Sequence, residues 1–162
     1  LGWSRQDILN QVDYTRHNKV HGQSYFRTGN LLANTRGILS SIETYYRYPA
    51  KLPPMTWLSD TIPASPVDLR AEKREDGLFE LSWNHAGEQH RVTYNIYRTR
   101  SDDFNVNRAE NLLAVGVKEP YLHLEVEDDD QAFYYFVTVS DSFHNESEPS
   151  TPAYFYHSQT IK

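Results

Sequence analysis

The spacing of hydrophobic residues changes partway along the chain. In residues 1–48 apolar side chains recur every three or four positions, the spacing of one face of an α-helix. In residues 66–162 they alternate with polar ones, the period of a β-strand. Five of the eight prolines fall within residues 49–66, and proline-dense backbone is extended and ends helices. The pattern therefore predicts two unlike parts joined by a proline-rich strap, residues 49–65.

The first part has the pattern of helix, strand and helix. Ser4 precedes apolar residues at helical spacing, and Asp7 stands three positions on, which indicates a capping box and a helix ending near Asn18. Residues Val20–Phe26 predict a short strand, and apolar residues from 31 to 46 predict a second helix that ends before Pro49. A lone strand cannot bury two helices, so we expect this part to belong to a larger structure.

The second part contains regularly spaced short runs with the strand period. We expect strands at Val67–Leu69, Leu78–Trp83, Val92–Arg98, Leu112–Val115, Tyr121–Leu124, Phe133–Val139 and Tyr154–Tyr156. Turn residues such as Asp76-Gly77 and His144-Asn145 separate them. Seven such strands predict an antiparallel β-sandwich, so the fold class is α+β and mainly β.

The phrases within this part carry a family resemblance. They are Pro66-Val-Asp-Leu, Leu81-Ser-Trp83, Tyr94-Asn-Ile-Tyr97-Arg98, Phe133-Tyr-Tyr-Phe-Val137-Thr-Val139 and Ser147-Glu-Pro-Ser150. In this order and spacing, residues 66–157 resemble a fibronectin type III domain, an immunoglobulin-like sandwich of seven strands.

The first part and the strap carry a second resemblance. Gly22-Gln-Ser-Tyr-Phe26, Gly37 and the strap phrase Pro49-Ala-Lys-Leu-Pro53-Pro-Met-Thr-Trp57 look like the end of a bacterial family of glycoside hydrolase-like proteins. Those proteins have a (β/α)8 barrel followed by a fibronectin type III-like domain. The resemblance implies that residues 1–48 are a remnant of the barrel, with its last strand near Val20–Phe26.

Charge is distributed unevenly between the two parts. Residues 1–65 hold seven Lys and Arg against four Asp and Glu, whereas residues 66–162 hold nine against eighteen. A second part with net charge −9 repels phosphate backbones, so nucleic acid is not expected as a partner. The chain has no cysteine and no apolar run long enough to span a membrane. The resemblance implies a protein that is secreted, periplasmic or on the surface of a bacterium, its targeting signal outside this sequence.

The sequence offers no catalytic pair. Glycoside hydrolysis uses two carboxyl groups on either side of the scissile bond. In the first 65 residues Asp7, Asp13 and Glu43 occupy helical positions and Asp60 lies in the strap. We therefore expect no catalytic residue in this chain, and the resemblance implies that the catalytic carboxylates lie upstream.

Five residues are candidates for binding a sugar. Tyr25 and Arg27 stand at the end of the predicted barrel strand, the edge that faces the substrate in such barrels, although Tyr25 also suits a core position. Trp57 in the strap suits either a sugar or an anchor that docks the sandwich on the barrel. Tyr134 and Phe136 point away from the sandwich core and suit either a sugar or a packing partner.

No cofactor or metal site is expected. The seven histidines are scattered along the chain. An acidic run, Glu125 to Asp130, has oxygen ligands that calcium prefers but lacks the glycine-spaced pattern of a calcium loop. A solvated loop between strands is the simpler interpretation.

These observations favour a non-catalytic C-terminal accessory module of a glycoside hydrolase acting on polysaccharide, which braces or positions its own upstream catalytic barrel. Two alternatives stay open: a carbohydrate-binding module and a protein–protein adhesion module. Unpaired edges of the barrel remnant also suit a dimer. The enzymatic assignment of the parent rests on the resemblance, because fold alone does not fix function.

Overall fold

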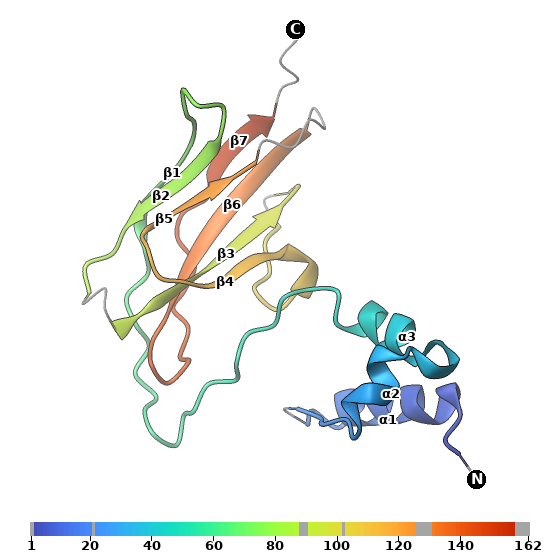
Figure 1. Ribbon diagram of the computed structural model, residues 1–162. Coiled ribbons are helices and arrows are strands. Elements are labelled where there is room, and N and C mark those ends of the chain that lie inside the picture. Colours follow the sequence, from blue (N-terminus) through green and yellow to red (C-terminus); the bar gives the residue numbers. More distant parts are fainter. Residues whose placement is uncertain (1, 21, 88–90, 102, 126–130, 158–162) are drawn as a thin grey trace, which may run out of the picture. The chain divides into compact units, whose positions relative to one another are not determined.

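The computed structural model describes residues 2–20, 22–87, 91–101, 103–125 and 131–157, and it divides into two compact units (Figure 1). Unit 1 is Leu1–Arg47 and consists of helices. Unit 2 is Tyr48–Lys162 and contains the strap together with the β-sandwich. The strap thus belongs to the same compact unit as the sandwich.

Unit 1 contains α1 (Arg5–His17), α2 (Thr28–Leu32), the 3-10 turn η1 (Thr35–Gly37) and α3 (Ile38–Tyr45). The predicted capping box is confirmed at the start of α1. The Asp7 backbone N–H donates to the Ser4 hydroxyl at 3.2 Å, and the Ser4 N–H donates to the Asp7 carboxylate at 2.8 Å. Each bond satisfies a donor that the first helical turn leaves without an intrahelical acceptor.

The predicted strand at Val20–Phe26 is wrong. The described residues of this segment form no strand and run as irregular backbone between α1 and α2. A strand is stabilised by hydrogen bonds to a neighbouring strand, and unit 1 supplies none among its described residues. The described residues of this unit thus show helices without the strand, and the barrel remnant stays a prediction.

The second helix predicted in this part is broken in two. Asn34, Arg36 and Gly37 adopt positive φ angles of 47°, 58° and 71°, which a continuous helix does not allow. Only glycine adopts this region without steric cost, and asparagine tolerates it better than most residues. The break separates α2 from α3, and α3 ends before Pro49 as predicted.

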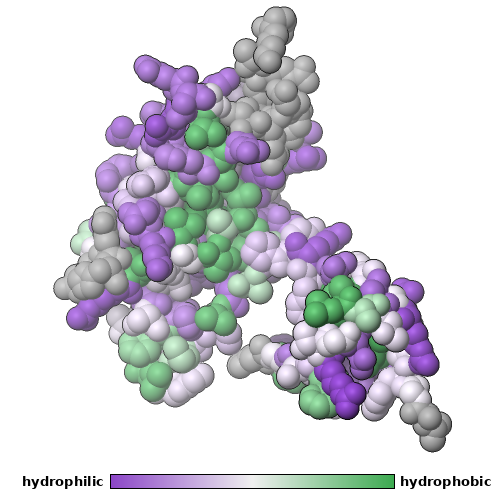
Figure 2. Space-filling model, in the orientation of Figure 1, coloured by the Kyte–Doolittle hydropathy of each residue, from purple (hydrophilic) through white to green (hydrophobic). Residues whose placement is uncertain are grey.

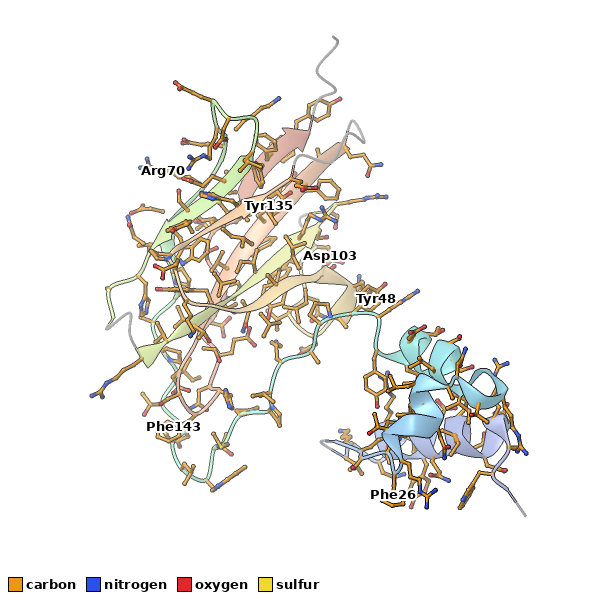
Figure 3. All side chains as sticks on the ribbon, viewed as in Figure 1. Phe26, Tyr48, Arg70, Asp103, Tyr135 and Phe143 are labelled. Atoms are coloured by element: carbon orange, nitrogen blue, oxygen red, sulfur yellow. The ribbon has the colours of Figure 1, made fainter. Side chains whose placement is uncertain are left out.

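The core of unit 1 is small. Among its described apolar residues only Val12 of α1 and Ile42 of α3 are buried. The Arg16 guanidinium ties the two helices together, because it donates to the Tyr45 carbonyl at 2.6 Å and lies over the Tyr45 and Tyr46 rings. By contrast Trp3, Tyr14 and Leu32 are exposed, and Phe26 projects into solvent (Figure 3).

Unit 2 is the predicted antiparallel sandwich. Its strands are β1 (Val67–Lys73), β2 (Phe79–Asn84), β3 (Thr93–Thr99), β4 (Leu112–Val117), β5 (Tyr121–Leu124), β6 (Gln131–Ser140) and β7 (Ala153–His157). A three-stranded sheet in the order β1-β2-β5 faces a four-stranded sheet in the order β4-β3-β6-β7 (Figure 1). All pairings are antiparallel. This is the strand arrangement of a fibronectin type III sandwich, so the predicted fold of this part is confirmed.

The main core lies between the two sheets. It is built from alternate residues of the central strands, and Tyr135 of β6 lies within it (Figure 3). Its buried members are Phe79, Leu81, Trp83, Tyr94, Ile96, Phe133, Tyr135, Val137 and Val139. Apolar side chains also gather at the surface around β5 and β6, flanked by polar ones (Figure 2). Burial of the alternate residues fixes the register, because a slip of one position would expose them all.

The chain after β6 extends the hydrogen bonding of that strand through two buried serines. The Val139 N–H donates to the Ser147 hydroxyl at 2.9 Å, and the Val137 N–H donates to the Ser150 hydroxyl at 3.1 Å. In return the Ser147 and Ser150 N–H groups donate to the carbonyls of Val139 and Val137. The Ser147-Glu-Pro-Ser150 phrase thus satisfies buried backbone groups of β6.

We predict that Ser150→Ala lowers the free energy of unfolding by about 1–3 kcal/mol, because the buried Val137 N–H loses an acceptor. Urea denaturation followed by tryptophan fluorescence measures the change. Ser142→Ala, at an exposed position, is the control and should stay within about 0.5 kcal/mol of the parent chain. Equal effects of the two substitutions would contradict the assignment.

Candidate functional site

A groove of about 750 Å³ lies between the strap and the four-stranded sheet. Leu52 and Ile62 of the strap and Val115 of β4 supply apolar wall. Lys51 of the strap, Asn95 of β3 and Glu146, which follows β6, supply polar groups. The strap and the sheet thus place an oppositely charged pair, Lys51 and Glu146, in a groove with apolar walls.

Glu146 is the centre of a hydrogen-bond network in this groove. Its Oε1 accepts from Tyr97 Oη at 2.5 Å, Thr138 Oγ1 at 2.6 Å and Asn95 Nδ2 at 3.1 Å. Its Oε2 accepts from Lys51 Nζ at 2.5 Å. Lys51 Nζ also donates to Tyr97 Oη at 3.0 Å. The side chains of Lys51 and Glu146 are only 26% and 20% exposed, so the pair is largely shielded from water.

The electrostatics of this network keep Glu146 ionised. Burial alone would raise the pKa of its carboxyl group, but hydrogen bonds from Lys51, Thr138 and Tyr97 outweigh burial and hold the pKa below its usual value. Burial, and next the bond to Glu146, raises the pKa of Tyr97, which stays a proton donor. A general acid in glycoside hydrolysis needs a raised pKa. Glu146, with its lowered pKa, lacks this property and acts here as an ionised hydrogen-bond acceptor for Lys51 and the sheet.

The backbone of the strap is held by the loop between β6 and β7. The Met55 N–H donates to the Phe143 carbonyl at 2.8 Å, and Asn145 Nδ2 donates to the Ser59 carbonyl at 2.9 Å. Phe143 lies at the end of the sandwich where the strap passes (Figure 3). The Asp141 carboxylate shapes this loop by accepting the N–H groups of Phe143 and Asn145, each at 2.8 Å. Strap and loop thus fix one another.

Two of the predicted sugar-binding residues lie together in unit 1. Tyr25 and Arg27 line an apolar hollow of about 340 Å³ with Trp3 and Phe26. The Arg36 guanidinium, also at this hollow, donates to the Trp3 carbonyl at 2.6 Å. Tyr25 is half-buried and Arg27 is exposed. The hollow combines aromatic rings with guanidinium donors, and its use for a sugar stays a prediction.

The other predicted residues are dispersed over unit 2. Trp57 is 73% exposed in unit 2, so its role, as a sugar contact or as an anchor that docks the sandwich on a barrel, stays a prediction. The prediction that Phe136 is exposed is wrong. Its side chain is buried because the connection between β3 and β4 folds over it. Its ring stacks on Phe104 at 4.1 Å between centroids. Tyr134 is half-buried beside it.

The ion pair that anchors the strap could not be predicted from the sequence. Lys51 and Glu146 are 95 positions apart, and no local pattern relates a lysine in a proline-rich strap to a glutamate beyond β6. The one available signal was indirect. Glu146 adjoins the Ser147-Glu-Pro-Ser150 phrase, and Lys51 sits inside the strap phrase that carried the second resemblance.

The described part of the chain holds no group of three or more His, Asp or Glu residues placed to bind a metal ion. Most of the acidic run from Glu125 to Asp130 lies outside the described residues. Among the helices described, none has the length and apolarity needed to cross a membrane.

We predict that Glu146→Gln lowers the free energy of unfolding by about 2–4 kcal/mol at pH 7, because Lys51 is left without its counter-charge. A carboxyl group with a lowered pKa in the folded state stabilises that state above its unfolded pKa, and this is lost as pH falls through the folded pKa. The parent chain should therefore lose stability below about pH 4.5, and the variant should lose less. Denaturant titrations between pH 7 and pH 3 measure both effects.

Lys51→Met combined with Glu146→Gln completes a double-mutant cycle. We expect a coupling free energy of about 1–3 kcal/mol between the two positions. Strict additivity would mean that the strap is not held by this pair.

The chain is similar in sequence to part of a larger bacterial protein. The chain is 29% identical over 157 residues to the protein named glycosyl hydrolase YngK of Bacillus subtilis (strain 168), a match that covers 91% of this chain and 30% of that protein. The chain thus spans less than a third of the relative's length. No family model matches the chain.

Two solved structures are similar to part of the chain. An Fn3-like protein from Clostridium thermocellum is 21% identical, with a TM-score of 0.47, over 58% of this chain and 92% of that one. Domains A168–A170 of titin are 18% identical, with a TM-score of 0.45, over 60% of this chain and 33% of that one. These similarities are too weak to support a fold assignment. The fold follows from the strand order alone. The chain is therefore similar, over both units, to part of a bacterial glycosyl hydrolase, and its second unit is a fibronectin type III sandwich.

Proposed function

We propose that this chain is a non-catalytic accessory part of a glycoside hydrolase acting on polysaccharide, which braces or positions the catalytic domain. The observation that supports this most is the extent of the similarity. It covers 91% of the chain but 30% of the glycosyl hydrolase, so most of a protein of that kind lies outside the matched segment. We assign the catalytic carboxylates to that remaining part.

The carboxyl groups of the chain support a non-catalytic role. Among the described residues, the carboxyl groups with shifted pKa values all shift downward: Asp7, Asp76, Glu80 and Glu146. Each accepts hydrogen bonds from neighbouring donors, as Glu146 does from Lys51 and Glu80 does from Arg74 at 2.8 Å. Groups of this kind are ionised acceptors that stabilise the fold, whereas glycoside hydrolysis also requires a carboxylic acid that gives up a proton.

The surface of unit 1 supports a bracing role. Trp3 is 67% exposed, Leu32 is 76% exposed and Phe26 is 95% exposed, although this unit buries only two apolar side chains among its described residues. An exposed aromatic and aliphatic surface of this kind is typical of a docking site. A catalytic barrel is the partner we assign to it, and the hollow lined by Tyr25 and Arg27 then lies at that junction. We also propose that the protein works outside the cytoplasm, as a secreted, periplasmic or cell-surface protein.

We predict that the chain releases no reducing sugar from a panel of polysaccharides such as xylan, mannan, β-glucan and starch. Reducing-end assays with a known hydrolase for each polymer as positive control measure this. Release above background that disappears in a carboxylate-to-amide variant would overturn the non-catalytic assignment.

Deleting the matching segment from the Bacillus subtilis relative tests the bracing role. We expect the truncated relative to unfold at a lower temperature than the full-length protein, although the truncation leaves its proposed catalytic carboxylates in place. Calorimetry of the full-length and truncated proteins gives the comparison. An unchanged unfolding temperature would speak against bracing.

A further inference from the structure

Three tyrosines form a strip on the outer face of the four-stranded sheet. Tyr134 lies on β6, and Tyr154 and Tyr156 lie on β7, which is an edge strand beside β6 (Figure 1). The register pairs Tyr134 with Tyr154 and Ala132 with Tyr156. Alternation points all three away from the core, into which Phe133 and Phe155 are directed. We call Tyr134, Tyr154 and Tyr156 the tyrosine strip.

The strip is exposed to solvent, and the Tyr134 and Tyr154 rings are held in place by packing. Tyr154 is 57% exposed and Tyr156 is 49% exposed. The Tyr134 ring contacts the Tyr154 ring, with centroids 5.2 Å apart, and Tyr134 itself packs beside the stacked pair of Phe104 and Phe136. An aromatic surface held on paired strands loses little conformational entropy when a ligand binds.

The strip is also uncharged. Its neighbours on the same face are Ala132 and, opposite Tyr134 on β3, Thr99. Next to the strip, the described strand positions thus offer aromatic rings, hydroxyl groups and a methyl group, and the Lys51–Glu146 ion pair lies farther along the same face, on Asn95, Tyr97 and Thr138. Residues 66–162 carry net charge −9, which repels an anionic polymer. The chemistry suits a neutral ligand with apolar faces and a hydroxyl rim.

We propose that the tyrosine strip binds a neutral polysaccharide. A pyranose ring presents C–H groups on its faces and hydroxyls at its edge, and tyrosine presents a π face and a hydroxyl, so the two are complementary. The inference rests on the proposed function, because it takes its ligand class from the similarity to a glycosyl hydrolase. The strip would hold the polymer while hydrolysis takes place on another domain.

Affinity gel electrophoresis of the full chain tests the strip. Gels contain soluble xylan, galactomannan, hydroxyethyl cellulose or, as the anionic contrast, polygalacturonate. We expect retardation by a neutral polymer and none by polygalacturonate. Tyr154→Ala with Tyr156→Ala should weaken the binding about tenfold or more, whereas the matching pair of Phe substitutions should retain most of it.

Tyr121→Ala is the matched control. Tyr121 is 44% exposed on β5, in the other sheet, and its removal should leave retardation unchanged. Thermal unfolding of every variant verifies that the sandwich remains folded. Retardation by no neutral polymer, or retardation that survives the double Ala substitution, would overturn the proposal.

Two further results distinguish failure of the sugar-binding proposal from failure of the proposed function. Self-association of the chain that the double Ala substitution abolishes would assign the strip to a second copy and overturn the sugar. Hydrolysis of a polymer by the chain would overturn the proposed function but leave the binding measurement to be judged on its own.

Discussion

The ionised carboxylate of Glu146 is the constraint on which the arrangement of unit 2 depends. A charge this shielded is stable only when it is paired and hydrogen-bonded. Thr138, Asn95 and Tyr97 of the sheet provide three of its donors, and Lys51 provides the counter-charge. Lys51 belongs to the strap, which has no helix or strand of its own. The ion pair between Lys51 and Glu146 therefore fixes the path of the strap. The contacts of Met55 and Ser59 with the β6–β7 loop continue the same attachment.

Unit 1, by contrast, is weakly packed. Its helices bury Val12 and Ile42 and leave Trp3, Phe26 and Leu32 largely in solvent. With so few buried apolar groups the hydrophobic effect contributes little to its stability, and a further surface is needed to cover the exposed rings. The contrast between a self-sufficient sandwich and an under-packed helical unit is the physical basis for proposing an accessory segment of a larger hydrolase.

The sandwich could be predicted from the sequence because each strand carries its own signal. Alternation at residues such as Phe133, Tyr135 and Val137 reports burial directly, and turn residues bound the runs. The strand at Val20–Phe26 failed because strand formation depends on a neighbour, which the local pattern does not reveal. Phe136 failed for a related reason: its outward direction was predicted correctly, but the stacking of Phe104 over it comes from a connection whose path is not periodic. Lys51 and Glu146 were missed because a pairing across 95 positions leaves no local trace.

Hydrogen exchange of the full chain, followed by mass spectrometry or NMR, tests the central claim most directly. Amides that open only with global unfolding exchange slowly, whereas weakly packed elements exchange at much smaller free energies. The account predicts that the Met55 amide in the strap is protected to a degree comparable with Val137 and Val139 of β6, and that α1 and α3 exchange far faster. Strap amides that exchange as freely as an open loop, or helices of unit 1 that are as protected as the sandwich core, would contradict it.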